Sequence, residues 1–165
     1  MPLIPDTAVF QKRLATLPIE TYRAGETLFA AGSRTGRLLI LRKGAVAIVK
    51  DEIEIAKVAE PGAVFGELSA LLDRPHTADV RAMETSQFHV GDAALLAQDP
   101  IALLYIAATL ARRLDGANQT LIELKNQLQA GQPHSVIGKT VEKMETLLGA
   151  GGTGLYTGDP YDSYA

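Results

Sequence analysis

Between residues 19 and 90, hydrophobic residues come in short, β-branched runs, and glycines separate one run from the next. Many short strands spaced by turn residues are typical of a β-sandwich or a β-barrel. The runs predict eight strands, at Ile19–Arg23, Thr27–Phe29, Arg37–Arg42, Ala45–Lys50, Ile53–Ala59, Val64–Phe65, Thr77–Ala82 and Ser86–His89. Residues 67–72 lack strand alternation, so we expect one or two helical turns inside this β region.

Helical spacing of hydrophobic residues appears on both sides of the β region. A first helix is expected over Ala8–Leu17 and a short one over Asp92–Gln98. A long helix is expected over Pro100–Gln129, because Asp99 is a good N-cap residue and proline fits the first helical position.

The long helix carries a heptad repeat. One seam position holds Leu103, Leu110, Ala117 and Leu124, and the other holds Ala107, Leu114, Leu121 and Leu128. Such a stripe either pairs with a second copy of the chain or packs on the chain's own strands. Its last turns extend beyond what one small barrel covers, which favours a homodimer formed through a coiled coil.

The chain changes character after the long helix, where Gly131 and Pro133 end the helical pattern. A weaker helix is expected over Val136–Leu148. The last 17 residues hold five of the fifteen glycines and three of the five tyrosines, which predicts a flexible tail. The expected domains are 1–130, with a barrel at about 19–90 and a long helix at about 100–129, and a short C-terminal segment over 131–165.

Composition narrows the functional classes. The 165 residues are 47% hydrophobic and 21% charged, include no cysteine and carry a net charge of −3. The missing cysteines exclude a disulfide scaffold, a thiolate zinc site and a cysteine nucleophile. There is no basic surplus for sequence-independent nucleic-acid binding and no apolar run of about 20 residues for a membrane helix. We therefore expect a cytoplasmic protein.

The clearest chemical signal lies between Phe65 and Ala82. Gly66 and Glu67 form a turn directly before the expected helical turns. The first turn of a helix presents free N–H groups and a positive dipole end, so this turn suits an anion. The Glu67 carboxylate can also accept hydrogen bonds from sugar hydroxyls. The alternative is that Glu67 only caps a structural turn.

Three stretches resemble the cyclic nucleotide-binding domain family. The first is Gly25-Glu26-x-Leu28-Phe29-x-x-Gly32, followed by Leu39-Ile40, Gly44 and Val46, which is similar to the family's opening strands. Phe65-Gly66-Glu67-Leu68 resembles the start of the phosphate-binding cassette, and the stretch from Pro75 to Ala82 resembles its end. Ala111-Arg112-Arg113-Leu114 is similar to the family's long C-terminal helix.

This resemblance implies a mainly β fold: an eight-stranded jelly-roll barrel with flanking helices and a long C-terminal helix. It also implies cAMP or cGMP as the ligand and no other cofactor. Glu67 would bind the ribose 2′-hydroxyl, amides near Ser69 would approach the cyclic phosphate, and Asn118 would face the purine. The candidate binding residues are Phe65, Gly66, Glu67, Leu68, Ser69, Arg74, His76, Thr77, Ala78 and Asn118.

One cassette position departs from the family pattern. The arginine that pairs with the phosphate comes nine positions after the glutamate, where this chain has His76. A neutral histidine offers at most one donor, so the exchange should weaken binding by roughly ten- to hundredfold. Of the nearby arginines, Arg74 is placed better than Arg81 to compensate.

Two functions remain open from the sequence. The first is a non-enzymatic, dimeric regulator that binds a cyclic nucleotide and signals through the long helix to an unknown partner protein. The second is a degenerate domain that keeps the fold as a ligand-independent interaction module. No catalytic constellation and no metal-site histidine spacing is visible, so neither catalysis nor a metal is expected. The residues after Ala130 are too few and too acidic for a DNA-reading domain.

Overall fold

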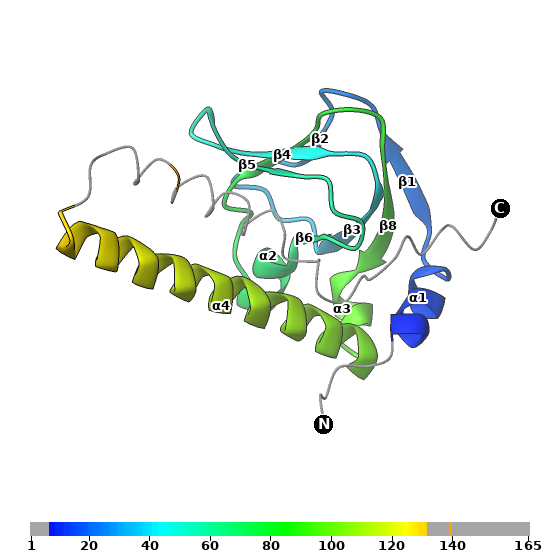
Figure 1. The fold of residues 1–165 in the computed structure, drawn as a ribbon. Coiled ribbons are helices and arrows are strands. Elements are labelled where there is room, and N and C mark those ends of the chain that lie inside the picture. The colour runs from blue at the N-terminus through cyan, green and yellow to red at the C-terminus, as the bar shows by residue number, and fades with distance from the viewer. Residues whose placement is uncertain (1–6, 132–138, 140–165) are drawn as a thin grey trace.

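Two antiparallel β-sheets form the body of the molecule in the computed structural model, which describes residues 7–131 and 139 (Figure 1). One sheet has the strand order β1-β8-β3-β6 and the other has the order β2-β7-β4-β5. The strands are β1 (Ile19–Tyr22), β2 (Thr27–Phe29), β3 (Arg37–Lys43), β4 (Val46–Lys50), β5 (Ile53–Val58), β6 (Val64–Phe65), β7 (Asp79–Ala82) and β8 (Ser86–Asp92). The prediction of a mainly β fold is confirmed, while closure of the sheets into a barrel stays a prediction.

Strand β3 separates two hydrophobic clusters, because successive side chains of a strand point to opposite faces. Leu39 and Leu41 pack between the sheets, in a cluster that includes Phe65 and Phe88. The residues that alternate with them along the strand, Leu38 and Ile40, pack with helical residues on the other face. Both faces are therefore buried, which explains the uninterrupted apolar run at 38–41.

Within residues 7–131, four helices flank the sheets: α1 (Thr7–Leu14), α2 (Glu67–Leu72), α3 (Ala93–Leu96) and α4 (Pro100–Gln129). Helix α4 runs along the molecule below the sheets, with α2 beside it and with α1 and α3 near its N-terminal end (Figure 1). The rings of Phe10 and Tyr105 stack with centroids 3.6 Å apart, and the Tyr105 hydroxyl donates to Gly62 O at 3.0 Å. These contacts anchor α1 and the start of α4 on the sheets.

The bounds of α4 agree with the sequence prediction. Asp99 Oδ1 accepts hydrogen bonds from the N–H groups of Ile101 and Ala102, and Pro100 occupies the first helical position. An N-cap side chain of this kind contributes about 1 kcal/mol, and the signal for it is local in sequence. The start of the long helix is therefore readable from a few adjacent residues.

Several other predicted bounds were wrong. Helix α1 ends at Leu14 and not at Leu17, because the next residues form turns that bond back to the helix. Helix α3 covers only Ala93–Leu96. Strand β8 extends to Asp92, because its end pairs with Arg37 of β3. Strand β7 begins at Asp79, and the two residues before it, which were expected in the strand, line a cavity instead.

The expected helix over Val136–Leu148 and the expected tail over 149–165 lie outside the described residues, apart from Lys139. Within the described part of the chain, no helix combines the length and the apolar character needed to span a bilayer.

Candidate functional site

Strand β6 passes into helix α2 through a glycine in the left-handed conformation. Gly66 has a φ of +90°, and a Cβ at this position would lie 2.5 Å from the backbone oxygen of Arg37. Phe29 closes the other side, with its ring 3.1 Å from the same point. Both the backbone angle and the close approach require glycine. The turn places Glu67 at the first position of α2, where the N–H groups have no partner within the helix.

Glu67 is joined to helix α4 by an ion pair. Arg113 Nη1 lies 2.6 Å from Glu67 Oε1, and the two side chains are 17% and 7% exposed. Arg113 Nη2 also donates to Val64 O at 3.3 Å. No hydrogen bond to Glu67 Oε2 is formed by the described residues. The carboxylate is therefore half satisfied by the protein, and one oxygen remains for another donor.

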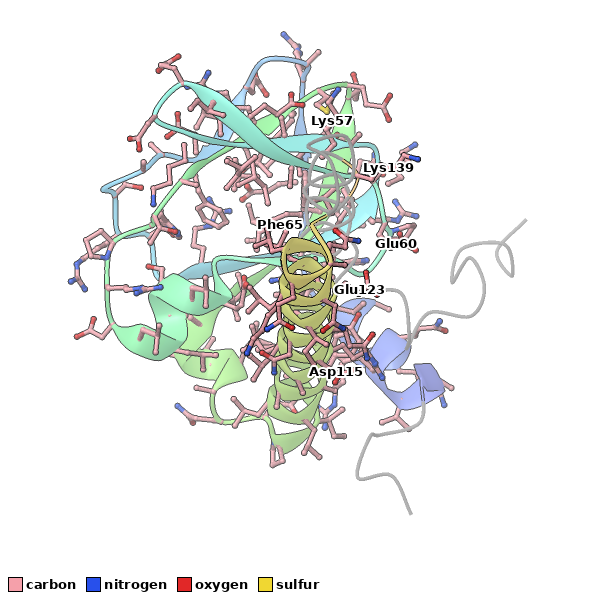
Figure 2. The ribbon with its side chains drawn as sticks, turned by 60° about the vertical axis from the view of Figure 1, so that its left-hand side comes forward. Lys57, Glu60, Phe65, Asp115, Glu123 and Lys139 are labelled. Carbon is pink, nitrogen blue, oxygen red and sulfur yellow. The ribbon has the colours of Figure 1, made fainter. Side chains whose placement is uncertain are left out.

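A cavity of about 390 Å³ lies beside this ion pair. That volume is within the range of small-ligand sites. Its wall is formed by Phe29, Ile48, Ile55, Ala56, Val64, Phe65, Gly66, Glu67, Leu68, Ser69, Pro75, His76, Thr77, Ala78, Val80, Leu110, Arg113 and Leu114. Figure 2 shows Phe65 between α4 and strands β4 and β5, all of which contribute to this wall. Such a wall suits a ligand with an apolar ring system and a few hydroxyl groups.

His76 lies at the edge of the cavity, held from two sides. Its ring stacks on Phe29 with centroids 4.2 Å apart, and its Nε2 lies 3.0 Å from Thr35 Oγ1. The residue is 8% exposed, and this burial lowers the pKa of His76 below its ordinary value of 6.5. The imidazole is therefore neutral at pH 7 and supplies no fixed positive charge to the cavity.

The other charged groups around the cavity are engaged with one another or exposed. Arg34 binds Asp73 at 2.8 Å on the surface. Asp79 accepts the Ala31 N–H at 2.7 Å and binds Arg81, and these contacts, the backbone one first, lower the pKa of Asp79. No three histidine, aspartate or glutamate side chains in the described ranges come together as a metal site would require.

Most of the predicted binding residues meet at the cavity. Those in its wall are Phe65, Gly66, Glu67, Leu68, Ser69, His76, Thr77 and Ala78. Arg74 is exposed, outside the wall, and its side chain makes no hydrogen bond or ion pair with the described residues. Asn118 is exposed on α4, one turn beyond Leu114, and is also outside the wall. The structure therefore does not bring the expected compensating arginine or the expected purine contact to the cavity.

Sequence reasoning missed the role of Arg113. The residue was part of a family motif, but its partner Glu67 lies 46 positions away in the chain. A signal existed, since an arginine beside the apolar stripe of a helix needs a partner when that side is covered. Thr35, which holds His76, gave no comparable signal, because an isolated threonine in a glycine-containing loop is common.

Helix α4 leaves part of its heptad stripe exposed. Leu114, Leu121 and Leu128 are 63%, 52% and 59% exposed. The other seam, with Leu103 and Leu110, is partly buried, and both of these residues line cavities against the sheets and α2. One seam thus covers the chain's own body, and the other is exposed, although Leu114 also lines the cavity beside Glu67. Pairing of two copies stays a prediction.

A family model described as cyclic nucleotide-binding domain matches residues 19–102. This range contains both sheets, the turn at Gly66 and Glu67, and helices α2 and α3. A search of curated proteins returned no match.

Several solved structures have a similar fold. A Thermus thermophilus catabolite activator protein aligns with a TM-score of 0.58 and 23% identity, over 90% of this chain and 83% of that chain. CBD2 of PKAR, bound to Sp-2Cl-cAMPS, aligns with a TM-score of 0.54 and 23% identity, over 73% of this chain and 88% of that chain. The regulatory domain of Toxoplasma gondii PKA with cAMP aligns with a TM-score of 0.54 and 18% identity. The alignment covers 62% of this chain and 42% of that chain. At these identities the likeness shows the fold.

Proposed function

Because the chain belongs to the cyclic nucleotide-binding domain family, we propose that it is a non-enzymatic regulatory module that binds cAMP or cGMP. The ligand occupies the cavity beside Glu67, and α4 carries the effect of binding to a partner protein. Support comes from the family match and from two similar structures, which hold cAMP or the analogue Sp-2Cl-cAMPS.

The observation that carries this proposal is the ion pair between Glu67 and Arg113. The ligand-facing carboxylate and the long helix share one contact, at 2.6 Å, and α4 also contributes Leu110 and Leu114 to the cavity wall. A ribose hydroxyl that donates to Glu67 Oε2 changes the charge available to Arg113. Ligand binding in the cavity and the position of α4 are then coupled through the Glu67–Arg113 ion pair, which is the kind of link that a regulatory module needs.

The other residues around the cavity contact the phosphate and the purine of the ligand in this proposal. The N–H groups of the first turn of α2, near Leu68 and Ser69, face the cyclic phosphate. Thr77 and Ala78 flank the phosphate from the segment before β7. The apolar residues Ile48 and Leu114 contact the purine, and Asn118 reaches the purine only if α4 moves toward the cavity.

Isothermal titration of the full chain with cAMP and then cGMP tests the proposal, after bound nucleotide has been removed. Dissociation constants in the micromolar range are expected. Glu67→Gln should weaken binding about ten- to hundredfold, because a charge-assisted hydrogen bond is worth about 1.5–3 kcal/mol. Glu84→Gln is the matched control, since Glu84 is exposed in the turn before β8 and outside the cavity wall. Equal affinities for both variants would place the ligand elsewhere.

A second candidate is a ligand-independent interaction module that forms a homodimer through α4. Two observations favour it: the neutral His76 where the family has an arginine, and the exposed leucine seam of α4. This candidate predicts no heat with either nucleotide at millimolar concentration and a stable dimer in its absence. A micromolar nucleotide complex would exclude it.

A further inference from the structure

The charges in the cavity wall balance without a ligand. Glu67 and Arg113 neutralise each other, and His76 is the other titratable residue among those that line the cavity. The phosphodiester of a cyclic nucleotide is a monoanion at neutral pH. Moving a charge out of water into a partly enclosed, mostly apolar cavity is costly unless an opposite charge meets it. The cavity therefore lacks one positive charge for this ligand.

The geometry of His76 allows it to supply that charge. Nε2 lies 3.0 Å from Thr35 Oγ1, and a hydroxyl oxygen can either donate to a neutral ring or accept from a protonated one. The Arg37 N–H, 3.4 Å from the same oxygen, leaves the hydroxyl free to accept a further donor. The second ring nitrogen, Nδ1, makes no hydrogen bond with the described residues, and the residue lines the cavity. A protonated ring thus keeps its Thr35 contact, with Nε2 now the donor, and presents a positively charged Nδ1–H donor to a ligand.

No other group on the surrounding elements takes over this task. On the loop from β2 to β3, Arg34 is bound to Asp73. On β7, Arg81 is bound to Asp79, and on α4, Arg113 is bound to Glu67. Arg74, on the turn after α2, is exposed and outside the cavity wall. Phe29 of β2, which stacks on the ring, carries no charge and presents a π face that favours a cation.

We propose that a cyclic nucleotide binds in this cavity together with one proton, which His76 takes up from solvent and which provides the positive charge opposite the cyclic phosphate. This inference rests on the proposed function and adds its regulation: the module reads nucleotide and pH together. His76 becomes a ligand contact that is charged only in the complex.

The direction of the pH effect follows from linkage. In the free protein, burial keeps the pKa of His76 below 6.5. The bound anion raises the pKa of the same ring, because it stabilises the imidazolium. Between the two pKa values the complex holds one more proton than the separated partners. The dissociation constant therefore falls as the pH falls, by up to about tenfold per pH unit.

Titration calorimetry of the full chain with cAMP at pH 7, in buffers with different enthalpies of ionisation, counts the protons directly. We expect an uptake approaching one proton per nucleotide. His76→Gln keeps a polar group for Thr35 and cannot be protonated, so it should bind more weakly with no uptake. His76→Arg carries a permanent charge, so it should bind at least tenfold more tightly than the native chain, again without uptake.

The outcomes separate this inference from the function on which it rests. Binding of cAMP by the native chain without proton uptake, or uptake that persists in His76→Gln, overturns the inference and leaves the function standing. If the native chain fails to bind at any pH from 5.5 to 8 while His76→Arg binds, His76 does not act as the cation, and the inference fails together with the proposed function of the native chain. If neither binds cAMP or cGMP, the proposed function itself fails.

Discussion

Arg113 Nη1 lies 2.6 Å from Glu67 Oε1, so the carboxylate beside the cavity is attached directly to helix α4. The two residues come from opposite ends of the region that forms the cavity wall, α2 and α4. Because both side chains are largely buried, solvent screens their attraction only weakly. A change in the charge or position of the Glu67 carboxylate therefore acts directly on Arg113 of helix α4.

Arg113→Met should lower the free energy of unfolding by about 3 kcal/mol, because it leaves the buried Glu67 carboxylate without its partner. The double variant Glu67→Gln with Arg113→Met should recover most of that loss, and urea denaturation measures both. Lys57→Met is the control, since Lys57 and Glu54 form an exposed pair at 3.5 Å whose loss should cost less than about 1 kcal/mol. Equal losses for Arg113→Met and Lys57→Met would contradict a stabilising role for the buried pair.

Gly66→Ala should destabilise the protein more than Gly25→Ala. Both glycines have a similar positive φ, +90° and +86°, so the backbone cost of about 1–2 kcal/mol is shared. Only at Gly66 does the added Cβ meet another backbone atom, at 2.5 Å. The melting temperatures of the two variants, compared with the native chain, measure the difference. Identical shifts would mean that the turn before α2 relaxes freely.

Stability should fall as the pH is lowered from 7 to 5. Burial lowers the pKa of His76 and of His89, and Arg42 adds to the effect at His89. In the unfolded chain both titrate near 6.5, so below that pH the unfolded state binds more protons and is favoured. The stability is fully present above about pH 7 and is lost as the pH approaches the lowered values. His76→Gln should make urea midpoints less dependent on pH over this interval.

Leu121→Lys should abolish dimer formation without changing the fold. Leu121 and Leu128 are exposed on α4 and lie outside the cavity wall, so their substitution separates assembly from ligand binding. A charge in the centre of a coiled-coil seam is strongly unfavourable. In sedimentation, the Leu121→Lys variant should be a monomer. Leu95→Lys is the control: Leu95 of α3 is 69% exposed, so this variant should sediment like the native chain. A native chain that is already monomeric would exclude pairing through α4.

Local signals explain what the sequence predicted well. The cap at Asp99 and Pro100 defined the start of α4, and the β-branched runs located the strands. The start of β7 was predicted two residues too early, because Thr77 and Ala78 continue the strand pattern in sequence but line the cavity in the structure. The partner of Glu67 was also missed, because a contact across 46 residues depends on how α4 packs on the sheets. Such a long-range ion pair depends on the tertiary structure, and the residues next to Glu67 in the sequence carry no signal for it.

Leu114, Leu121 and Leu128 lie on one seam of helix α4, so the seam that contributes Leu114 to the cavity wall continues into the exposed Leu121 and Leu128. Because α4 contributes Leu110 and Leu114 to the cavity wall, an outward movement of this helix would open the cavity in the proposed complex. In the proposed homodimer, a second copy that contacts Leu121 and Leu128 would restrain that movement. The residence time of the ligand should therefore lengthen as the protein concentration rises, so that release kinetics report on assembly.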